Sequence, residues 1–356
     1  MTAPEFITGI SRSPFRPAMW LLSGHVQTLY PSLFRSPITV PRVRERIHLS
    51  DGDWLHVDWH LPVAWQGTRA PMAIILHGLS GSSSSHYVLG LQQALAARGM
   101  ASLAMNARGA TGQANDLPRT HHAGTHDDLA EVLVMVRERY PDVPLALVGY
   151  SLGGAITLNA LVLESLPDTV FAAAAVSVPL RLDACADRLD QGFSRVYRKH
   201  LMGELLKSWR RKAVRLAEVG NEEVAQHIHH VLDTVPMNTF RELDDALFAG
   251  LHGFDSAADY YHRCSPRQHL GEIRVPTLLL QSADDPFLTP ECVPHRRELS
   301  ADVHLELSAR GGHVGFIESG EIWHQPTYYL ERRIPDFIEA MLARSQVSSS
   351  LRSALP

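Results

Sequence analysis

Short apolar runs alternate with amphipathic stretches over most of this chain, and that alternation restricts the fold more than any other feature. Thr125 and Asp128 suggest a capping box, and apolar residues from Leu129 to Val136 then fall on one helical face. The runs of buried-strand type are Met72–Leu76, Ala101–Met105, Leu145–Val148, Phe171–Val178, Pro276–Gln281 and Val303–Leu307. Such runs between amphipathic helices predict an α/β fold, with a mainly parallel sheet that has helices on both faces.

The alternation stops once, and this interruption divides the chain. Residues 181–265 are charged and read as helical, without a convincing strand. A helical stretch between two strands of one sheet is most simply a cap over the edge of that sheet. The predicted parts are an irregular, proline-rich N-terminal extension at 1–42, an α/β core at 43–180 and 266–344, a helical cap at 181–265, and a flexible tail at 345–356.

Individual elements follow from the same patterns. Val43–Leu49 and Trp54–His60 flank an Asp-Gly turn and predict a β-hairpin. Predicted helices lie at His86–Arg98, Leu152–Leu166, near Pro290–Leu299 and around Thr327–Ala343.

Histidine is abundant and cysteine is scarce, with 20 against 3 in 356 residues. Cys185, Cys264 and Cys292 are odd in number and far apart, so we expect neither a disulfide framework nor a CxxC zinc site. No basic segment followed by an apolar run opens the chain, and the run Ala18–Leu22 is far too short to span a bilayer. A soluble, reducing, cytoplasmic setting is the resulting expectation.

Charge gives little reason to expect a macromolecular partner. The net charge is −5, which does not suggest binding to nucleic acid. The predicted cap carries basic residues from Arg195 to Arg215, which would suit an anionic substrate or peripheral contact with a lipid surface. A solvated helical face is the simpler interpretation of that charge.

The sharpest local signal is Gly149-Tyr150-Ser151-Leu152-Gly153-Gly154, which contains a G-x-S-x-G motif. A predicted strand enters the motif and a predicted helix leaves it, as a nucleophile elbow requires. The turn is so tight that neighbouring side chains would clash, which explains the glycines. It would raise the Ser151 oxygen above the sheet, at a helix N-terminus that favours negative charge.

A serine hydroxyl becomes an effective nucleophile only when an oriented base takes its proton. In this architecture an acid follows a late strand and a histidine follows the last strand. His313 lies just past the run Val303–Leu307, between glycines that predict a mobile loop. Asp285 is the preferred acid because three residues separate it from the end of a strand, which is the usual step, and Pro286 fixes the next turn. Asp284 remains the competing acid; otherwise it is a turn or capping residue.

An oxyanion hole needs two backbone N–H groups directed at the developing negative charge. The N–H of Leu152, immediately after the candidate nucleophile, is the first candidate. The second should follow an earlier strand, and the run Met72–Leu76 leads directly into His77-Gly78-Leu79-Ser80-Gly81. The Leu79 N–H is therefore the predicted second donor.

These motifs together resemble the α/β-hydrolases, and more narrowly the AB hydrolase 4 family, the group of bacterial YheT-like esterases. The stretches that carry the narrower resemblance are Gly24-His25-Val26-Gln27-Thr28-Leu29, Arg108-Gly109-Ala110-Thr111-Gly112, Gly192-Phe193-Ser194-Arg195-Val196-Tyr197, Asp284-Asp285-Pro286-Phe287 and Gly311-Gly312-His313-Val314-Gly315-Phe316. The resemblance covers residues 20 to 340. It implies hydrolysis of carboxylic esters with short- to medium-chain acyl groups and no cofactor, and its eukaryotic members include acyl-transferring and phospholipid-cleaving proteins.

The remaining histidines do not require a metal ion. His121, His122 and His126 precede a predicted helix, and the spacing of His227, His229 and His230 does not put all three on one helical face. We therefore predict no metal and no cofactor. For His77 we expect a strand-end imidazole that is hydrogen-bonded to the backbone near the oxyanion loop.

The hypothesis that results is a serine esterase acting on a small-molecule ester. Ser151 is the nucleophile, His313 the general base and acid, and Asp285 the residue that orients the imidazole, with Leu79 and Leu152 as oxyanion donors. Two alternatives share these residues: an acyltransferase that passes the acyl group to an alcohol, and a non-catalytic binding module on the same fold.

Overall fold

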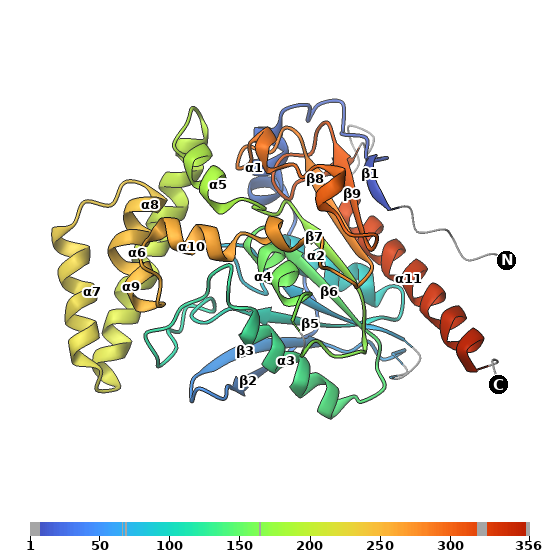
Figure 1. The fold of residues 1–356 in the computed structure, drawn as a ribbon, viewed down its shortest axis with the longest axis horizontal. Helices are drawn as coiled ribbons and strands as arrows, with labels where there is room; N and C mark the ends of the chain where they lie inside the picture. The colour runs from blue at the N-terminus through green and yellow to red at the C-terminus, as the bar shows by residue number, and fades with distance from the viewer. Residues whose placement is uncertain (1–7, 66, 68–69, 164, 319–325, 354–356) are drawn as a thin grey trace.

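The computed structural model describes residues 8–65, 67, 70–163, 165–318 and 326–353, and its centre is a nine-stranded sheet with the order β1-β9-β8-β7-β6-β4-β5-β3-β2 (Figure 1). The strands are β1 (Gly9–Arg12), β2 (Val43–His48), β3 (Trp54–His60), β4 (Met72–Leu76), β5 (Ala101–Asn106), β6 (Leu145–Tyr150), β7 (Val170–Val176), β8 (Thr277–Ser282) and β9 (Val303–Ser308). Along the spatial order of the sheet, each adjacent pair from β1 as far as β5 is parallel. The last two pairs, β5–β3 and β3–β2, are antiparallel. The predicted fold and the predicted hairpin are both confirmed.

Helices cover both faces of this sheet because its central strands are apolar on both sides. The helices are α2 (His86–Ala96), α3 (His126–Arg139), α4 (Leu152–Ala160) and α11 (Tyr329–Ser353). In β4, Ile74 packs with side chains of α3 and α4, and its neighbour Ile75 packs with those of α2 and α11. Successive residues of a strand point to opposite faces, so a wholly apolar strand must be buried on both.

Between β7 and β8 the chain forms helices alone, which we call the helical insert (residues 182–264). It consists of α5 (Leu182–Leu189), α6 (Ser194–Glu218), α7 (Glu222–Thr234), α8 (Phe240–Leu243), a π-helical turn η2 (Asp244–Phe248), α9 (Ala249–Leu251) and α10 (Ala257–Cys264). The insert stands to one side of the sheet, with α7 farthest from it (Figure 1). Among the described residues, no helix is long and apolar enough to cross a membrane.

The N-terminal segment is more ordered than the sequence analysis predicted. β1 pairs in parallel with β9 at the edge of the sheet, and α1 (Gly24–Phe34) follows it. The expectation of an irregular segment over 1–42 is therefore wrong for these two elements. A strand of four residues is too short to show a recognisable alternation of apolar and polar residues. β1 is a strand because it pairs with the exposed edge of β9.

Three further local predictions are also wrong. The tail predicted as flexible at 345–356 is helical as far as Ser353, as the C-terminal part of α11; residues 354–356 lie outside the described residues. The helix predicted near Pro290–Leu299 is two short 3-10 helices, η4 (Pro290–Cys292) and η5 (Arg296–Glu298), because Pro294 lacks the N–H that a continuous helix needs. The helix after Ser151 ends at Ala160 instead of Leu166.

The capping box predicted for Thr125 and Asp128 does not form. The Thr125 hydroxyl donates to the His122 carbonyl at 2.8 Å. The Asp128 carboxylate accepts two hydrogen bonds from the Arg108 guanidinium, at 3.0 and 2.7 Å. A long-range ion pair has replaced the local cap.

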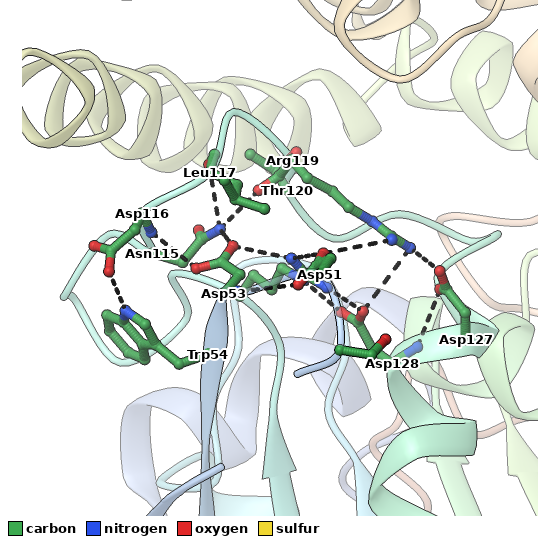
Figure 2. Close-up of polar contacts among 12 residues, drawn as sticks. Asp51, Asp53, Trp54, Asn115, Asp116, Leu117, Arg119, Thr120, Asp127 and Asp128 are labelled. Carbon is green, nitrogen blue, oxygen red and sulfur yellow. Dashed lines mark hydrogen bonds and ion pairs between the residues drawn. The ribbon is translucent and has the colours of Figure 1, made fainter. Parts of the chain in front are cut away.

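That ion pair belongs to a buried polar network beneath the insert. Arg108 also contacts Asp53 Oδ2 at 2.9 Å and Asp51 Oδ2 at 2.7 Å. Asp53 in turn accepts from the Asp116 N–H at 2.9 Å and from the Asn115 amide. Figure 2 shows Asp53 between the loop that carries Asn115 and Asp116 and the carboxylates of Asp51 and Asp128. The network therefore fixes the loop between β5 and α3.

The insert is bonded to the same loop through α6. Lys212 is buried, and its ammonium donates to the carbonyl oxygens of Asn115, Leu117 and Arg119 at 3.2, 2.8 and 3.3 Å. Arg215, one turn further on, donates to Asp116 at 2.8 Å. The position of α6 thus depends on the loop between β5 and α3, which is bonded in turn to Asp53 in the network of Arg108.

Replacing Arg108 by methionine should destabilise the protein by about 3–5 kcal/mol, because the buried carboxylates of Asp53 and Asp128 lose their cation. Urea unfolding would measure the loss. Lys207→Met is the control, since it removes an exposed ion pair with Glu204, and we expect a change below about 1 kcal/mol. Equal losses in the two variants would contradict the importance of the buried network.

Candidate active site

Ser151 stands at the junction of β6 and α4, in a backbone conformation that residues with a side chain rarely adopt. Its φ is 52° and its ψ is −120°. The Ser151 N–H donates to the Val176 carbonyl at 2.8 Å, and its own carbonyl accepts from the Gly154 N–H at 2.9 Å. Backbone strain of this kind costs about 1–3 kcal/mol and persists only where the surroundings enforce it. The motif's predicted strand–turn–helix geometry is present.

Gly153 shows what enforces this turn. A Cβ at this position would lie 2.4 Å from the His77 carbonyl oxygen and 2.6 Å from that of Leu76. The first turn of α4 is therefore pressed against the end of β4, at a distance that any side chain would prevent. The same approach brings the loop after β4 beside the serine, since a Cβ on Gly78 would lie 3.0 Å from Ser151 Cβ.

Three of the predicted site residues come together in one hydrogen-bonded chain. His313 Nε2 lies 2.9 Å from Ser151 Oγ, and His313 Nδ1 lies 2.8 Å from Asp285 Oδ2. Because a carboxylate can only accept, the proton of the neutral imidazole is on Nδ1, and Nε2 is free to accept from the serine. The Asp285 carboxylate is fully buried and the imidazole is 11% exposed, so bulk water screens this chain weakly.

The two competing acids have different partners. Asp285 bonds the imidazole, and its second oxygen, Oδ1, accepts from the Phe287 N–H at 2.8 Å. Asp284 Oδ1 accepts from the Gly312 N–H at 3.0 Å. Asp284 therefore contacts the backbone of the histidine loop, while Asp285 contacts the imidazole itself.

The two predicted oxyanion donors lie beside the serine with their N–H groups unused. Leu79 and Leu152 both line the cavity that contains Ser151. Within the part of the chain that the structure describes, neither backbone N–H donates a hydrogen bond. An unpaired N–H at a helix N-terminus and another in the adjoining loop are the donors that a developing oxyanion needs.

His77 supports the oxyanion loop from within, as the sequence analysis expected. Its Nδ1–H donates to the Gly78 carbonyl at 2.8 Å, and its Nε2 accepts from the Ala107 N–H at 3.1 Å. Burial lowers the pKa of His77 to about 4, so the imidazole stays neutral at pH 7 and keeps both bonds.

A cavity of about 310 Å³ opens between the serine and the helical insert. The insert contributes mostly apolar side chains to its wall, namely Leu182, Ala186, Leu189, Leu201, Leu205, Trp209, Phe240, Leu243, Phe248 and Tyr260. The polar exceptions are Ser208, Arg211, Lys212 and Asp244, and the Asp244 carboxylate accepts from the Tyr261 hydroxyl at 2.7 Å. Burial raises the pKa of Asp244 to about 7, so this carboxylate is mostly protonated in mildly acidic solution.

His122 and the three histidines of α7 have ordinary surroundings. His122 packs edge-on against the rings of Phe248, Phe254 and Tyr260. His227, His229 and His230 are exposed on α7. Within the described ranges, no group of three or more His, Cys, Asp or Glu side chains is arranged to hold a metal ion.

The sequence analysis missed the part that α1 plays in this site. Thr28 Oγ1 accepts from the His313 N–H at 2.8 Å. Gly312, with a φ of 60°, approaches α1 so closely that a Cβ would lie 2.3 Å from the Gly24 carbonyl oxygen. The glycine beside His313 serves this close packing, whereas the sequence analysis explained it by loop mobility. The stretch Gly24–Leu29 carries the family resemblance, but the sequence did not indicate that it would contact the loop of His313.

Comparison with known proteins fits this geometry. The sequence pattern of the alpha/beta hydrolase fold family matches residues 73–320. The chain belongs to the α/β-hydrolase family. Among its relatives is YheT of Escherichia coli (strain K12), an esterase by name, which is 36% identical over 93% of this chain and 95% of YheT. Phospholipase ABHD3 of Homo sapiens is 27% identical over 92% of this chain and 79% of its own length.

A solved structure extends the comparison of the fold. The Pyrococcus furiosus esterase Pf2001 is similar with a TM-score of 0.52, over 94% of this chain and 98% of that chain, at 15% identity. This α/β-hydrolase therefore has one sequence relative named an esterase and one named a phospholipase, and it shares its fold with Pf2001.

Gly153→Ala should destabilise this α/β-hydrolase by about 1–3 kcal/mol, because the added methyl collides with the His77 and Leu76 carbonyl oxygens. Thermal unfolding would show it as a lower Tm. The matched control is Gly203→Ala within α6, where nothing lies within 4 Å of the added Cβ, and there we expect a gain of up to about 1 kcal/mol. A tolerated Gly153→Ala would contradict the tight contact between α4 and β4.

Proposed function

We propose that this α/β-hydrolase is a serine esterase that cleaves carboxylic esters through an acyl-enzyme. The observation that carries the proposal is the hydrogen-bonded chain from Asp285 through His313 to Ser151, with distances of 2.8 and 2.9 Å. A serine so placed has an imidazole at its oxygen and a buried carboxylate behind the imidazole, which is the arrangement that activates a hydroxyl nucleophile.

In the first half of the reaction, Ser151 Oγ attacks the ester carbonyl carbon while its proton passes to His313 Nε2. Asp285 stabilises the imidazolium that forms and keeps Nδ1 as the protonated nitrogen. The Leu79 and Leu152 N–H groups donate to the oxyanion; one such donor is typically worth about 10²–10³ in rate. The imidazolium then protonates the leaving alkoxide, and an alcohol departs.

Water completes the cycle by the same proton transfers. His313 takes a proton from the water as it attacks the acyl carbonyl, and the same two N–H groups bind the second oxyanion. When that intermediate collapses, His313 returns the proton to Ser151 Oγ and the carboxylic acid leaves. Each residue thus acts twice, and the enzyme regains its starting protonation state.

The apolar wall of the cavity favours a substrate whose acyl group is apolar and of short to medium length. That acyl group would lie against the helical insert. A volume of about 310 Å³ is at the lower end of the usual range for small-molecule pockets, roughly 300–1,000 Å³. We propose that residues 181–265 act as a cap over this chamber. Burial of each methylene of an acyl chain would contribute about 0.8 kcal/mol to binding.

Ser151→Ala should lower turnover of a p-nitrophenyl ester by at least about 10³-fold, because no other group replaces the nucleophile. It should also abolish labelling by a fluorophosphonate probe, read by mass spectrometry of the intact protein. Ser50→Ala, an exposed serine in the β2–β3 turn, is the control and should keep both signals. Equal rates for wild type and Ser151→Ala would reject the proposed function, and added ethanol would reveal acyl transfer as an ester product.

Asp285→Asn should lower kcat by about 10⁴-fold, because an amide beside Nδ1 favours the wrong imidazole tautomer. Asp284→Asn should lower kcat by less than about tenfold, since its Oδ1 still accepts the Gly312 N–H. The same ester assay on both variants, with Tm measured for each, separates chemistry from folding. A larger loss in the Asp284 variant would make Asp284 the triad acid.

A further inference from the structure

An aromatic ring lies flat against the imidazole of the proposed general base. The rings of Phe287 and His313 are parallel to within 15°, with centroids 4.0 Å apart. The hydrogen bonds of His313 to Asp285 and Ser151 fix its two nitrogens but leave the ring free to tilt about the line through them. A flat ring in van der Waals contact restricts that tilt.

Phe287 is itself held by the turn that carries the acid. Its N–H donates to Asp285 Oδ1 at 2.8 Å, so one short turn fixes both the carboxylate and the stacked ring. The Asp285 carboxylate therefore bonds His313 through one oxygen and the backbone of Phe287 through the other. The acid and the ring cannot move independently.

The first turn of α6, in the helical insert, holds this loop from the other direction. The buried Ser194 hydroxyl donates to the Pro286 carbonyl at 2.7 Å. The ring of Tyr197 lies against Phe287 with centroids 5.0 Å apart. Ser194 and Tyr197 are three residues apart, so both project from one side of the helix toward one loop.

Tyr197 has a further contact with α1. Its ring stacks on His25, with centroids 5.8 Å apart and an angle of 15°, and its hydroxyl is hydrogen-bonded to His25 Nδ1 at 3.1 Å. Tyr197 is buried, so this position is fixed by packing on several sides. His25, Tyr197 and Phe287 all lie in stretches that carry the resemblance to the AB hydrolase 4 family. The proposed triad chemistry uses none of these three side chains.

We propose that Phe287 is a positioning residue for the imidazole of His313, and that Tyr197 holds Phe287 in place from the helical insert. The inference rests on the proposed esterase function. The imidazole must accept from Ser151 and later donate to the leaving group, so small tilts of the ring misalign both transfers. A misplacement of about 1 Å in an active site can cost about 10²-fold in rate.

The test compares Phe287→Leu with Phe287→Tyr in the full-length protein, using p-nitrophenyl ester kinetics. We expect Phe287→Leu to lower kcat by about 10- to 100-fold while KM changes less than about threefold, because orientation is lost and substrate binding is not. Phe287→Tyr keeps the ring and should retain kcat within about threefold. Phe171→Leu, a half-buried phenylalanine in β7, is the control for a general packing defect and should retain kcat.

Tyr197 is tested by a double-mutant cycle. Tyr197→Leu should lower kcat less than Phe287→Leu, and the double variant should lose about as much as Phe287→Leu alone, because both changes release the same ring. Fully additive losses would show that Tyr197 does not act through Phe287.

Two kinetic outcomes would overturn the role of Phe287: an unchanged kcat in Phe287→Leu, or a raised KM with unchanged kcat, which would make it a substrate contact. A similar loss in Phe171→Leu would make the effect structural. NMR of the His313 ring protons provides a readout independent of turnover, since the ring current of Phe287 should shift them and Phe287→Leu should remove that shift. An inactive wild type would reject the esterase proposal, whereas ring shifts that do not respond to Phe287→Leu would reject the stacking itself.

Discussion

The contact between the first turn of α4 and the end of β4 is the constraint on which the site depends. Gly153 lies so close to the His77 and Leu76 carbonyls that a side chain cannot fit. This contact holds Ser151 at a φ of 52° and also places the loop of Gly78 and Leu79 beside it. One close approach therefore positions both the proposed nucleophile and the backbone N–H groups proposed to bind the oxyanion.

The other site residues reach this point from distant parts of the chain because the sheet gathers its strand ends at one edge. Asp285 follows β8, His313 follows β9, and both strands lie parallel to β7 and β6. Two further segments complete the surroundings. α1 holds the His313 backbone through Thr28, and α6 packs Tyr197 against Phe287. The insert is in turn bonded to the β5–α3 loop through Lys212.

Prediction from sequence succeeded where residue patterns are local and failed where a partner is distant. The apolar runs placed the central strands. The G-x-S-x-G motif and the two strand ends pointed to Ser151, Asp285 and His313, whose side chains the structure brings into one hydrogen-bonded chain. The capping box at Thr125 failed because Asp128 bonds Arg108, which pattern alone does not reveal. Cys185 and Cys292 are 107 residues apart, yet their thiols are in hydrogen-bonding contact at 3.7 Å, without a disulfide.

The sequence by itself determined the central strands, the chain order of serine, acid and histidine, and the glycines of the motif, because each can be read from residue patterns along the chain. Only the tertiary structure decided that Asp285 and not Asp284 bonds the imidazole, since both acids occupy the same turn and differ only in direction. It also decided that α1 and the helical insert line the cavity beside Ser151. Those contacts arise from packing between segments far apart in the chain, and no periodicity encodes them.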